Sequence, residues 1–112
     1  MNNSTKAKLR NGETVLGTFV FLGDPAVVEI AALAGFDFVI IDSEHAPRGP
    51  EAIEGMIRAA EARGITPIVR VSRTDEKEIL RALESGAQGI IVPQLESGEQ
   101  AAEAVAATRY PP

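Results

Sequence analysis

Hydrophobic residues occur in two kinds of run that alternate along the chain. Short, nearly continuous apolar runs are typical of strands buried on both faces. Segments with apolar residues three or four positions apart indicate amphipathic helices between them. The predicted strands cover residues 14–21, 36–42, 66–71 and 89–93, and the predicted helices cover residues 26–34, 51–63, 75–85 and 97–109.

The ends of the predicted helices carry their own signals. Asp24 suits an N-cap, and Pro25 suits the first helical position after it. Ser97 and Gln100 have the spacing of a capping box at the start of the last helix. Three helices are followed by glycine, which adopts a left-handed conformation at little steric cost. These glycines are Gly35, Gly64 and Gly86.

The order βαβαβαβα predicts a parallel sheet with right-handed crossovers. An open doubly wound sheet would be complete at 112 residues, whereas a (β/α)8 TIM barrel needs roughly 250. Two details favour the barrel: the glycine-rich phosphate fingerprints of nucleotide-binding open sheets are missing, and residues 109–112 follow a helix with no further strand. We therefore expect residues 1–112 to be one unit, the N-terminal half of a barrel domain.

Composition removes several classes of protein. The net charge is −5 with both signs interspersed, which argues against a nucleic-acid surface. No apolar run approaches the roughly 20 residues of a membrane span, and nothing at the N-terminus resembles a secretory signal. The chain has no cysteine, so thiolate chemistry is excluded and a cytoplasmic location is the default expectation.

Polar residues collect where the predicted strands end, which is where parallel α/β folds carry their chemistry. The second strand runs into Asp42-Ser43-Glu44-His45, and the fourth runs into Pro93-Gln94. A carboxylate such as Asp42 could orient the His45 imidazole and leave its other nitrogen free to accept a proton. The alternative for His45 is an ordinary surface-loop histidine with solvated neighbours.

Charged residues elsewhere have competing interpretations. Arg70 lies inside the apolar run of the third strand, so it needs an anionic partner. It could stabilise a developing enolate oxygen, or form a structural ion pair with Asp42 or Glu44. Glu44 could be a metal ligand, an outer-shell partner of a metal, or a solvated loop residue. The acidic residues of the third predicted helix, Glu78 and Glu84 among them, are usually explained as a charged outer face.

The sequence resembles a known family, the metal-dependent (class II) pyruvate aldolases of the 4-hydroxy-2-oxoheptanedioate aldolase type. These enzymes are related to the citrate lyase β-subunit group. The likeness spans nearly the whole chain in order. Its most specific parts are the Asp-x-Glu-His-Ala-Pro run and the later Val-Arg-Val. The matching segments are residues 16–19, 35–47, 67–71, 83–93 and 107–112.

The resemblance implies a (β/α)8 barrel, a divalent metal such as Mg²⁺, Mn²⁺ or Co²⁺, and reversible cleavage of 4-hydroxy-2-oxo acids to pyruvate and an aldehyde. The metal would act as a Lewis acid that holds the carboxylate and keto oxygens of pyruvate. His45 matches the family's general base, Arg70 matches the residue that stabilises the pyruvate enolate, and Asp42 lies beside the base.

The resemblance also bears on residues outside that pair of strands. Glu84 stands where the family commonly has an aspartate credited with raising the pKa of the base. Glu44 would be an outer-shell partner of the metal, and Gln94 is a candidate substrate-binding residue beside Arg70. Phe19 occupies a position where relatives often have tryptophan.

The family's direct metal ligands are a Glu and an Asp on later strands, beyond Pro112. We therefore expect this chain alone to be inactive or nearly so, and a homo-oligomer at full length. The alternatives are a non-catalytic open-sheet binding module or a decayed remnant. A barrel lyase of the citrate lyase β type, acting on acyl-CoA thioesters, is disfavoured because those relatives lack the histidine at this strand end.

Overall fold

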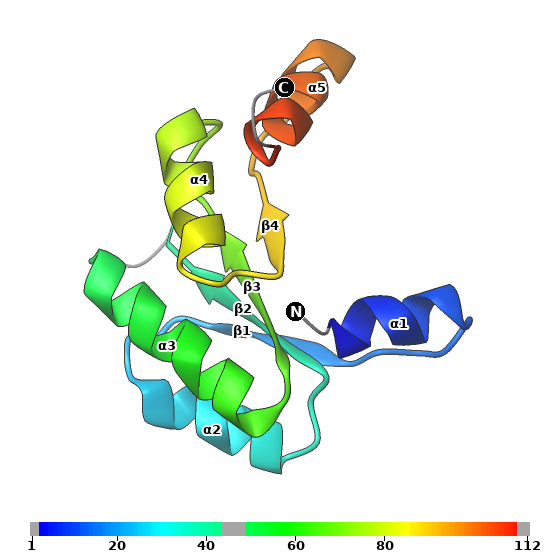
Figure 1. Cartoon of the computed structure of the whole chain (residues 1–112), viewed down its shortest axis with the longest axis vertical. Coiled ribbons are helices and arrows are strands. Elements are labelled where there is room, and N and C mark those ends of the chain that lie inside the picture. The colour runs from blue at the N-terminus through cyan, green and yellow to red at the C-terminus, as the bar shows by residue number, and fades with distance from the viewer. Residues whose placement is uncertain (1–2, 44–48, 110–112) are drawn as a thin grey trace.

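The computed structural model describes residues 3–43 and 49–109 (Figure 1). It confirms all four predicted strands and all four predicted helices, with β1 and β4 shorter than expected. One further helix, α1, precedes them. The elements are α1 (Ser4–Arg10), β1 (Gly17–Val20), α2 (Pro25–Leu33), β2 (Phe38–Asp42), α3 (Pro50–Arg63), β3 (Thr66–Arg70), α4 (Glu76–Glu84), β4 (Gly89–Ile91) and α5 (Gly98–Ala107).

The four strands form one parallel sheet in the order β1-β2-β3-β4. Alternate residues of each strand point to opposite faces. The face that is packed against helices carries Val39, Ile41, Val69 and Val71, all buried. These four residues belong to the hydrophobic core cluster together with buried residues of α2, α3 and α4.

That core decides between the two architectures that the sequence left open. A doubly wound sheet reverses its strand order and carries helices on both faces. Here the strand order follows the sequence, and α2, α3 and α4 all contribute to a core on one face. Such a sheet curls in one direction, so the chain forms four consecutive βα units of the barrel type.

The helix-end signals of the sequence are confirmed in the structure. The Asp24 carboxylate accepts a hydrogen bond from the Ala26 N–H at 3.0 Å. Gly64 caps α3 in the left-handed conformation, with φ of 76°. The Ser97 hydroxyl accepts from the Gln100 N–H at 3.2 Å, whereas the Gln100 side chain accepts from the Glu96 N–H at 2.7 Å.

The helix that sequence analysis did not predict, α1, lies at the amino ends of the strands (Figure 1). It is short and polar, so its sequence shows no apolar period. Tertiary contacts hold it instead: the Thr5 hydroxyl lies 2.7 Å from the Thr66 hydroxyl and 3.1 Å from the Asp37 carbonyl oxygen. Lys8 Nζ lies 2.6 Å from Asp37 Oδ1. The sheet therefore fixes α1, and α1 covers the amino edge of the sheet.

The second face of the sheet, which we call the inner face, carries the residues that alternate with the core. In β1 and β2 these are Gly17, Phe19, Phe38, Ile40 and Asp42, by the pairing register. The Phe38 ring occupies the space where a Cβ of residue 17 would lie, which explains the glycine there. No helix of residues 3–43 or 49–109 is long and apolar enough to cross a membrane.

Candidate active site

Two of the predicted site residues meet on the inner face at the carboxyl edge of the sheet. Asp42 and Arg70 are register partners at the ends of β2 and β3. Arg70 Nη1 lies 3.9 Å from Asp42 Oδ2. The Asp42 side chain is fully buried, whereas 26% of the Arg70 side chain is exposed. The ion pair that was one alternative for Arg70 is therefore present with Asp42, and part of the guanidinium still faces the open inner side.

An aromatic ring completes this corner. The guanidinium carbon of Arg70 lies 6.0 Å from the centre of the Phe19 ring, which is within the range of a cation–π interaction. Phe19 in turn stacks on Phe21, with ring centres 5.9 Å apart and planes 4° apart. The Phe19 ring therefore lies beside the arginine and limits where the guanidinium can point.

Gln94 and Glu84 lie at opposite ends of the sheet. Gln94 comes three residues after β4, at the same edge as Arg70, and is exposed. Its φ of 56° is left-handed, which is uncommon outside glycine and often marks a functional turn. Glu84 ends α4, just before the amino end of β4, where the Gln88 N–H donates to the Pro67 carbonyl oxygen. Within one chain, Glu84 is not brought to the Asp42–Arg70 corner.

The remaining two candidates, Glu44 and His45, lie outside the described residues. Ser43 is the last described residue before them. Its N–H and its hydroxyl both donate to the Arg70 carbonyl oxygen, at 3.0 and 2.6 Å. The strand ends that carry Asp42 and Arg70 are therefore joined beyond the last pair of their ladder.

The divalent metal that the resemblance implies would need several carboxylate or imidazole ligands close together. Within residues 3–43 and 49–109, no group of three or more His, Cys, Asp or Glu side chains is arranged to hold a metal ion. The buried carboxylate at the inner corner, Asp42, faces the Arg70 cation. This part of the chain therefore does not fit a metal centre by itself.

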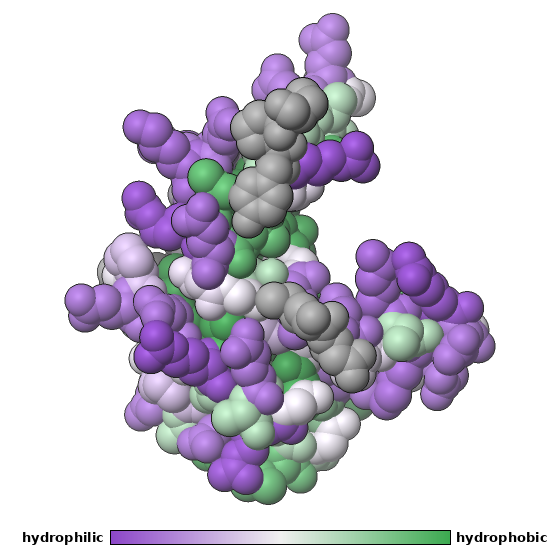
Figure 2. Space-filling view, viewed as in Figure 1, coloured by the Kyte–Doolittle hydropathy of each residue, from purple (hydrophilic) through white to green (hydrophobic). Residues whose placement is uncertain are grey.

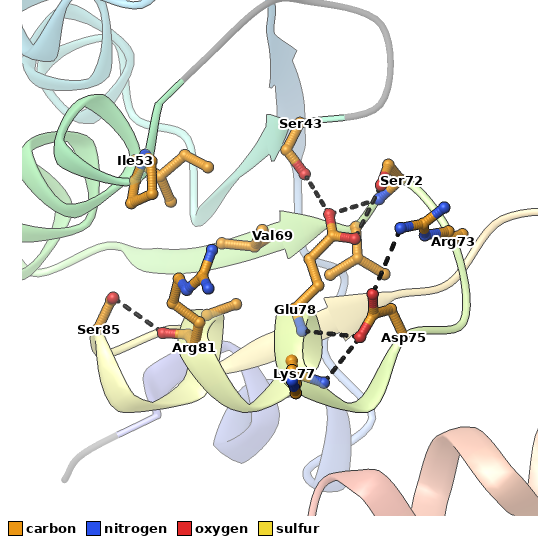
Figure 3. A pocket seen from close by; sticks show the side chains of 13 residues that line it. Ser43, Ile53, Val69, Ser72, Arg73, Asp75, Lys77, Glu78, Arg81 and Ser85 are labelled. Atoms are coloured by element: carbon orange, nitrogen blue, oxygen red, sulfur yellow. Dashed lines mark hydrogen bonds and ion pairs between the residues drawn. The ribbon is translucent and has the colours of Figure 1, made fainter.

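A cavity of about 430 Å³ opens on the other face, between α3 and α4 (Figure 3). Val69 and Val71 line it, so it lies in the helix layer and not at the Asp42–Arg70 corner. Glu78, for which a charged outer helix face was the usual explanation, lines the cavity and is half-buried. The Glu78 carboxylate accepts from the Ser72 N–H and the Ser72 hydroxyl, both at 2.8 Å.

The sequence held a weak signal for this interaction. Asp75 is the N-cap of α4, and Glu78 stands three residues later, as in a capping box. The Glu78 side chain extends past Asp75 to Ser72 in the loop after β3, and only the folded structure shows that Ser72 is its partner.

Comparison with known proteins now places the chain. The model of the HpcH/HpaI aldolase/citrate lyase family matches residues 15–112. The chain belongs to this family. The match includes the strands that carry Asp42 and Arg70 and leaves out only α1 and the turn after it.

Two curated relatives are similar over almost the whole chain. A 4-hydroxy-2-oxovalerate aldolase of Novosphingobium aromaticivorans is 43% identical over 111 residues, 98% of this chain and 42% of that protein. A hydroxypyruvate/pyruvate aldolase of Paraburkholderia phytofirmans is 42% identical over 110 residues, 98% of this chain and 41% of that protein. The chain therefore spans about two fifths of the length of these relatives.

A solved structure agrees with this placement. The citrate synthase SbnG superposes with a TM-score of 0.91 at 43% identity, over 96% of this chain and 44% of its own. The fold and the family are thus shown by sequence and by structure, for a segment that matches less than half of the related chains.

Proposed function

We propose that the chain is the N-terminal half of a barrel enzyme that cleaves 4-hydroxy-2-oxo acids reversibly to pyruvate and an aldehyde. The observation that carries the proposal is the Asp42–Arg70 corner on the inner face, in a chain that belongs to an aldolase/citrate lyase family. The carboxyl edge of parallel strands is where barrel enzymes bind their substrates.

The proposed reaction uses a base and an anion-stabilising group. The base, His45 by resemblance, takes the proton of the C4 hydroxyl. The C3–C4 bond then breaks, C4 becomes the aldehyde carbon, and the electron pair passes to C3 and the keto oxygen as the pyruvate enolate. Protonation of C3 gives pyruvate. Arg70 is the cation that would face the enolate oxygen, where its charge favours the developing anion.

Other groups belong to the proposal by resemblance. Asp42 holds Arg70 in place and lies two residues before Glu44, and Gln94 stands at the same edge to contact substrate. Glu84 lies at the far end of the sheet, so a part in catalysis would need a second copy of the chain to bring it to the corner. The proposed enzyme is a homo-oligomer at full length. It binds a small-molecule 2-oxo acid and an aldehyde. It uses Mg²⁺, Mn²⁺ or Co²⁺, whose direct protein ligands are expected beyond Pro112.

A second candidate is a condensation that forms citrate. It is favoured by one specific observation, the 43% identity to a protein named citrate synthase, which equals the identity to a relative named aldolase. Both reactions make or break a carbon–carbon bond next to a carbonyl group, and both place an enolate where Arg70 could stabilise it.

The test assays two proteins side by side. One is this 112-residue chain, and the other is the chain joined to the C-terminal part of the Novosphingobium aromaticivorans relative. Each is incubated with a 4-hydroxy-2-oxo acid and Mg²⁺, Mn²⁺ or Co²⁺, with and without EDTA, and pyruvate is measured. A parallel arm supplies acetyl-CoA and oxaloacetate and measures citrate.

We expect the joined protein to release pyruvate, EDTA to abolish the release, and the 112-residue chain alone to be inactive. Full-rate release from the short chain would contradict the need for a second half. Citrate formation without pyruvate release from the joined protein would favour the second candidate, and neither product would overturn both.

A further inference from the structure

One carboxylate of the helix layer contacts Ser43 and Ser72, the described residues that follow β2 and β3 behind the candidate site. Glu78 points from α4 toward the ends of β2 and β3, between Ser43 and Ser72 (Figure 3). One of its oxygens accepts from the Ser72 N–H, and the other accepts from the Ser72 hydroxyl, both at 2.8 Å. This bidentate contact uses a charged acceptor, which makes the hydrogen bonds stronger than neutral ones.

The same carboxylate reaches the neighbouring strand end. Glu78 Oε1 lies 3.5 Å from the Ser43 hydroxyl. That hydroxyl donates to the Arg70 carbonyl oxygen at 2.6 Å, and the Ser43 N–H donates to the same oxygen at 3.0 Å. Glu78 therefore contacts the residue that follows Asp42 and a residue two positions after Arg70.

The effect of this arrangement is on backbone position. Asp42 and Arg70 point to the inner face, whereas Glu78 approaches from the helix face, so it does not touch the proposed substrate. Its two hydrogen bonds hold Ser72 after β3, and its carboxylate lies against Ser43 after β2. In an enzyme, a shift of about 1 Å in such a segment can cost on the order of a hundredfold in rate.

We propose that Glu78 is a positioning residue of the site, which anchors Ser72 by two hydrogen bonds and lies against the Ser43 hydroxyl, so that Asp42 and Arg70 keep their register at the carboxyl edge. The inference rests on the proposed function for its kinetic consequence, but its structural consequence can be measured without any activity. The hydrogen bonds and not the net charge do the positioning, so a neutral side chain of the same shape should replace Glu78 in large part.

The experiment compares Glu78→Ala and Glu78→Gln with Glu76→Ala, which removes an exposed carboxylate of the same helix. Amide hydrogen exchange is measured in the 112-residue chain. The reporters are the Ser72 and Ser43 amides, and the control is the Gln88 amide at the other end of the sheet, which donates to Pro67. Steady-state kinetics for pyruvate release are measured in the joined protein.

For Glu78→Ala we expect exchange of the Ser72 amide to accelerate about tenfold or more, and that of Ser43 to accelerate as well, with Gln88 unchanged. In the joined protein kcat should fall about ten- to a hundredfold, while KM changes less than about threefold. Glu78→Gln should restore most of kcat and of the exchange protection, and Glu76→Ala should match the unmodified protein.

The inference is overturned if Glu78→Ala leaves the exchange of Ser72 and Ser43 unchanged, if its kinetics equal those of Glu76→Ala, or if Glu78→Gln is no better than Glu78→Ala. The two proposals fail separately. A joined protein without turnover contradicts the proposed function, and the exchange data on the chain alone then decide whether Glu78 positions Ser72 and Ser43.

Discussion

At the residue scale, two arginine–aspartate pairs that are close together in sequence differ in how deeply they are buried. Arg70 lies 3.9 Å from a fully buried Asp42. Arg73 lies 3.6 Å from Asp75, but 78% of its side chain is exposed. Water screens the second pair, so that pair contributes little to the stability of the fold. The Asp42 carboxylate is removed from water, so its charge depends on the nearby Arg70 cation for stabilisation.

We therefore predict different costs for removing the two arginines. Arg70→Ala should lower the free energy of unfolding by about 2 kcal/mol, less than for a fully buried pair because Arg70 is partly exposed. Arg73→Ala, the matched control, should cost less than about 1 kcal/mol. Urea unfolding of both variants tests this, and a double-mutant cycle with Asp42→Asn isolates the pair. Equal costs for the two arginines would contradict the buried-pair interpretation.

At the scale of elements, α1 is attached to the sheet largely through polar contacts. Among the described residues, one charged contact of α1 is the Lys8–Asp37 ion pair at 2.6 Å. The hydrogen bond from Lys8 and the hydrogen bond from the Leu16 N–H hold the pKa of Asp37 below its usual value. The same carboxylate raises the pKa of Lys8. A helix attached in this way should respond to pH.

The direction of the response follows from the pKa shifts. A carboxylate with a lowered pKa stabilises the fold above its unfolded pKa of about 4, and this stabilisation is lost as the pH falls through the lower folded value. We expect Asp37→Asn to be less stable than the unmodified chain at pH 7, with the difference shrinking below about pH 4.

Thermal unfolding across pH 2–7 measures this difference. Glu54→Gln, which removes one side of the exposed pair with Arg58, is the control and should change stability little at any pH. A difference between Asp37→Asn and the unmodified chain that stays constant down to pH 2 would contradict the assignment.

At the scale of the whole molecule, two strand edges of the described sheet and one apolar helix face remain uncovered. The strands β1 and β4 end the sheet on either side, so each has one strand edge without a partner in the described sheet. On α2, Ile30 and Leu33 share a face and are 64% and 73% exposed. Figure 2 shows hydrophobic residues at the lower end of the molecule, where Figure 1 places α2. Open edges and apolar patches favour association.

We expect the isolated chain to self-associate as its concentration rises, and Ile30→Lys with Leu33→Lys to weaken that association. Because both side chains are exposed, the double variant should keep its folded far-UV spectrum. Leu9→Lys, which changes an exposed leucine on α1, is the control. Sedimentation velocity over a range of concentrations gives the answer. Association unchanged by the double variant would assign it to the strand edges instead.

The meeting of Asp42 and Arg70 could be anticipated from the strand ends, and the placements that could not be anticipated have a common cause. Asp42, Arg70 and Gln94 were predicted because each stands at or just after the end of an apolar strand. The same rule could not place Glu84, since its position at the end of a helix puts it at the opposite edge of the sheet. Glu78 looked like a solvated helix residue, because the sequence does not show that the turn before α4 brings Ser72 back to it, or that the end of β2 brings Ser43 beside it.

The sequence by itself determined the order of strands and helices, their end signals and the family, because apolar spacing and cap residues act within a few positions. Only the tertiary structure decided that one face of the sheet takes all the helices of the core, that Asp42 and Arg70 are register partners on the other face, and that α1 covers the amino edge. These features depend on contacts between residues some 30 to 60 positions apart, and no local pattern encodes them.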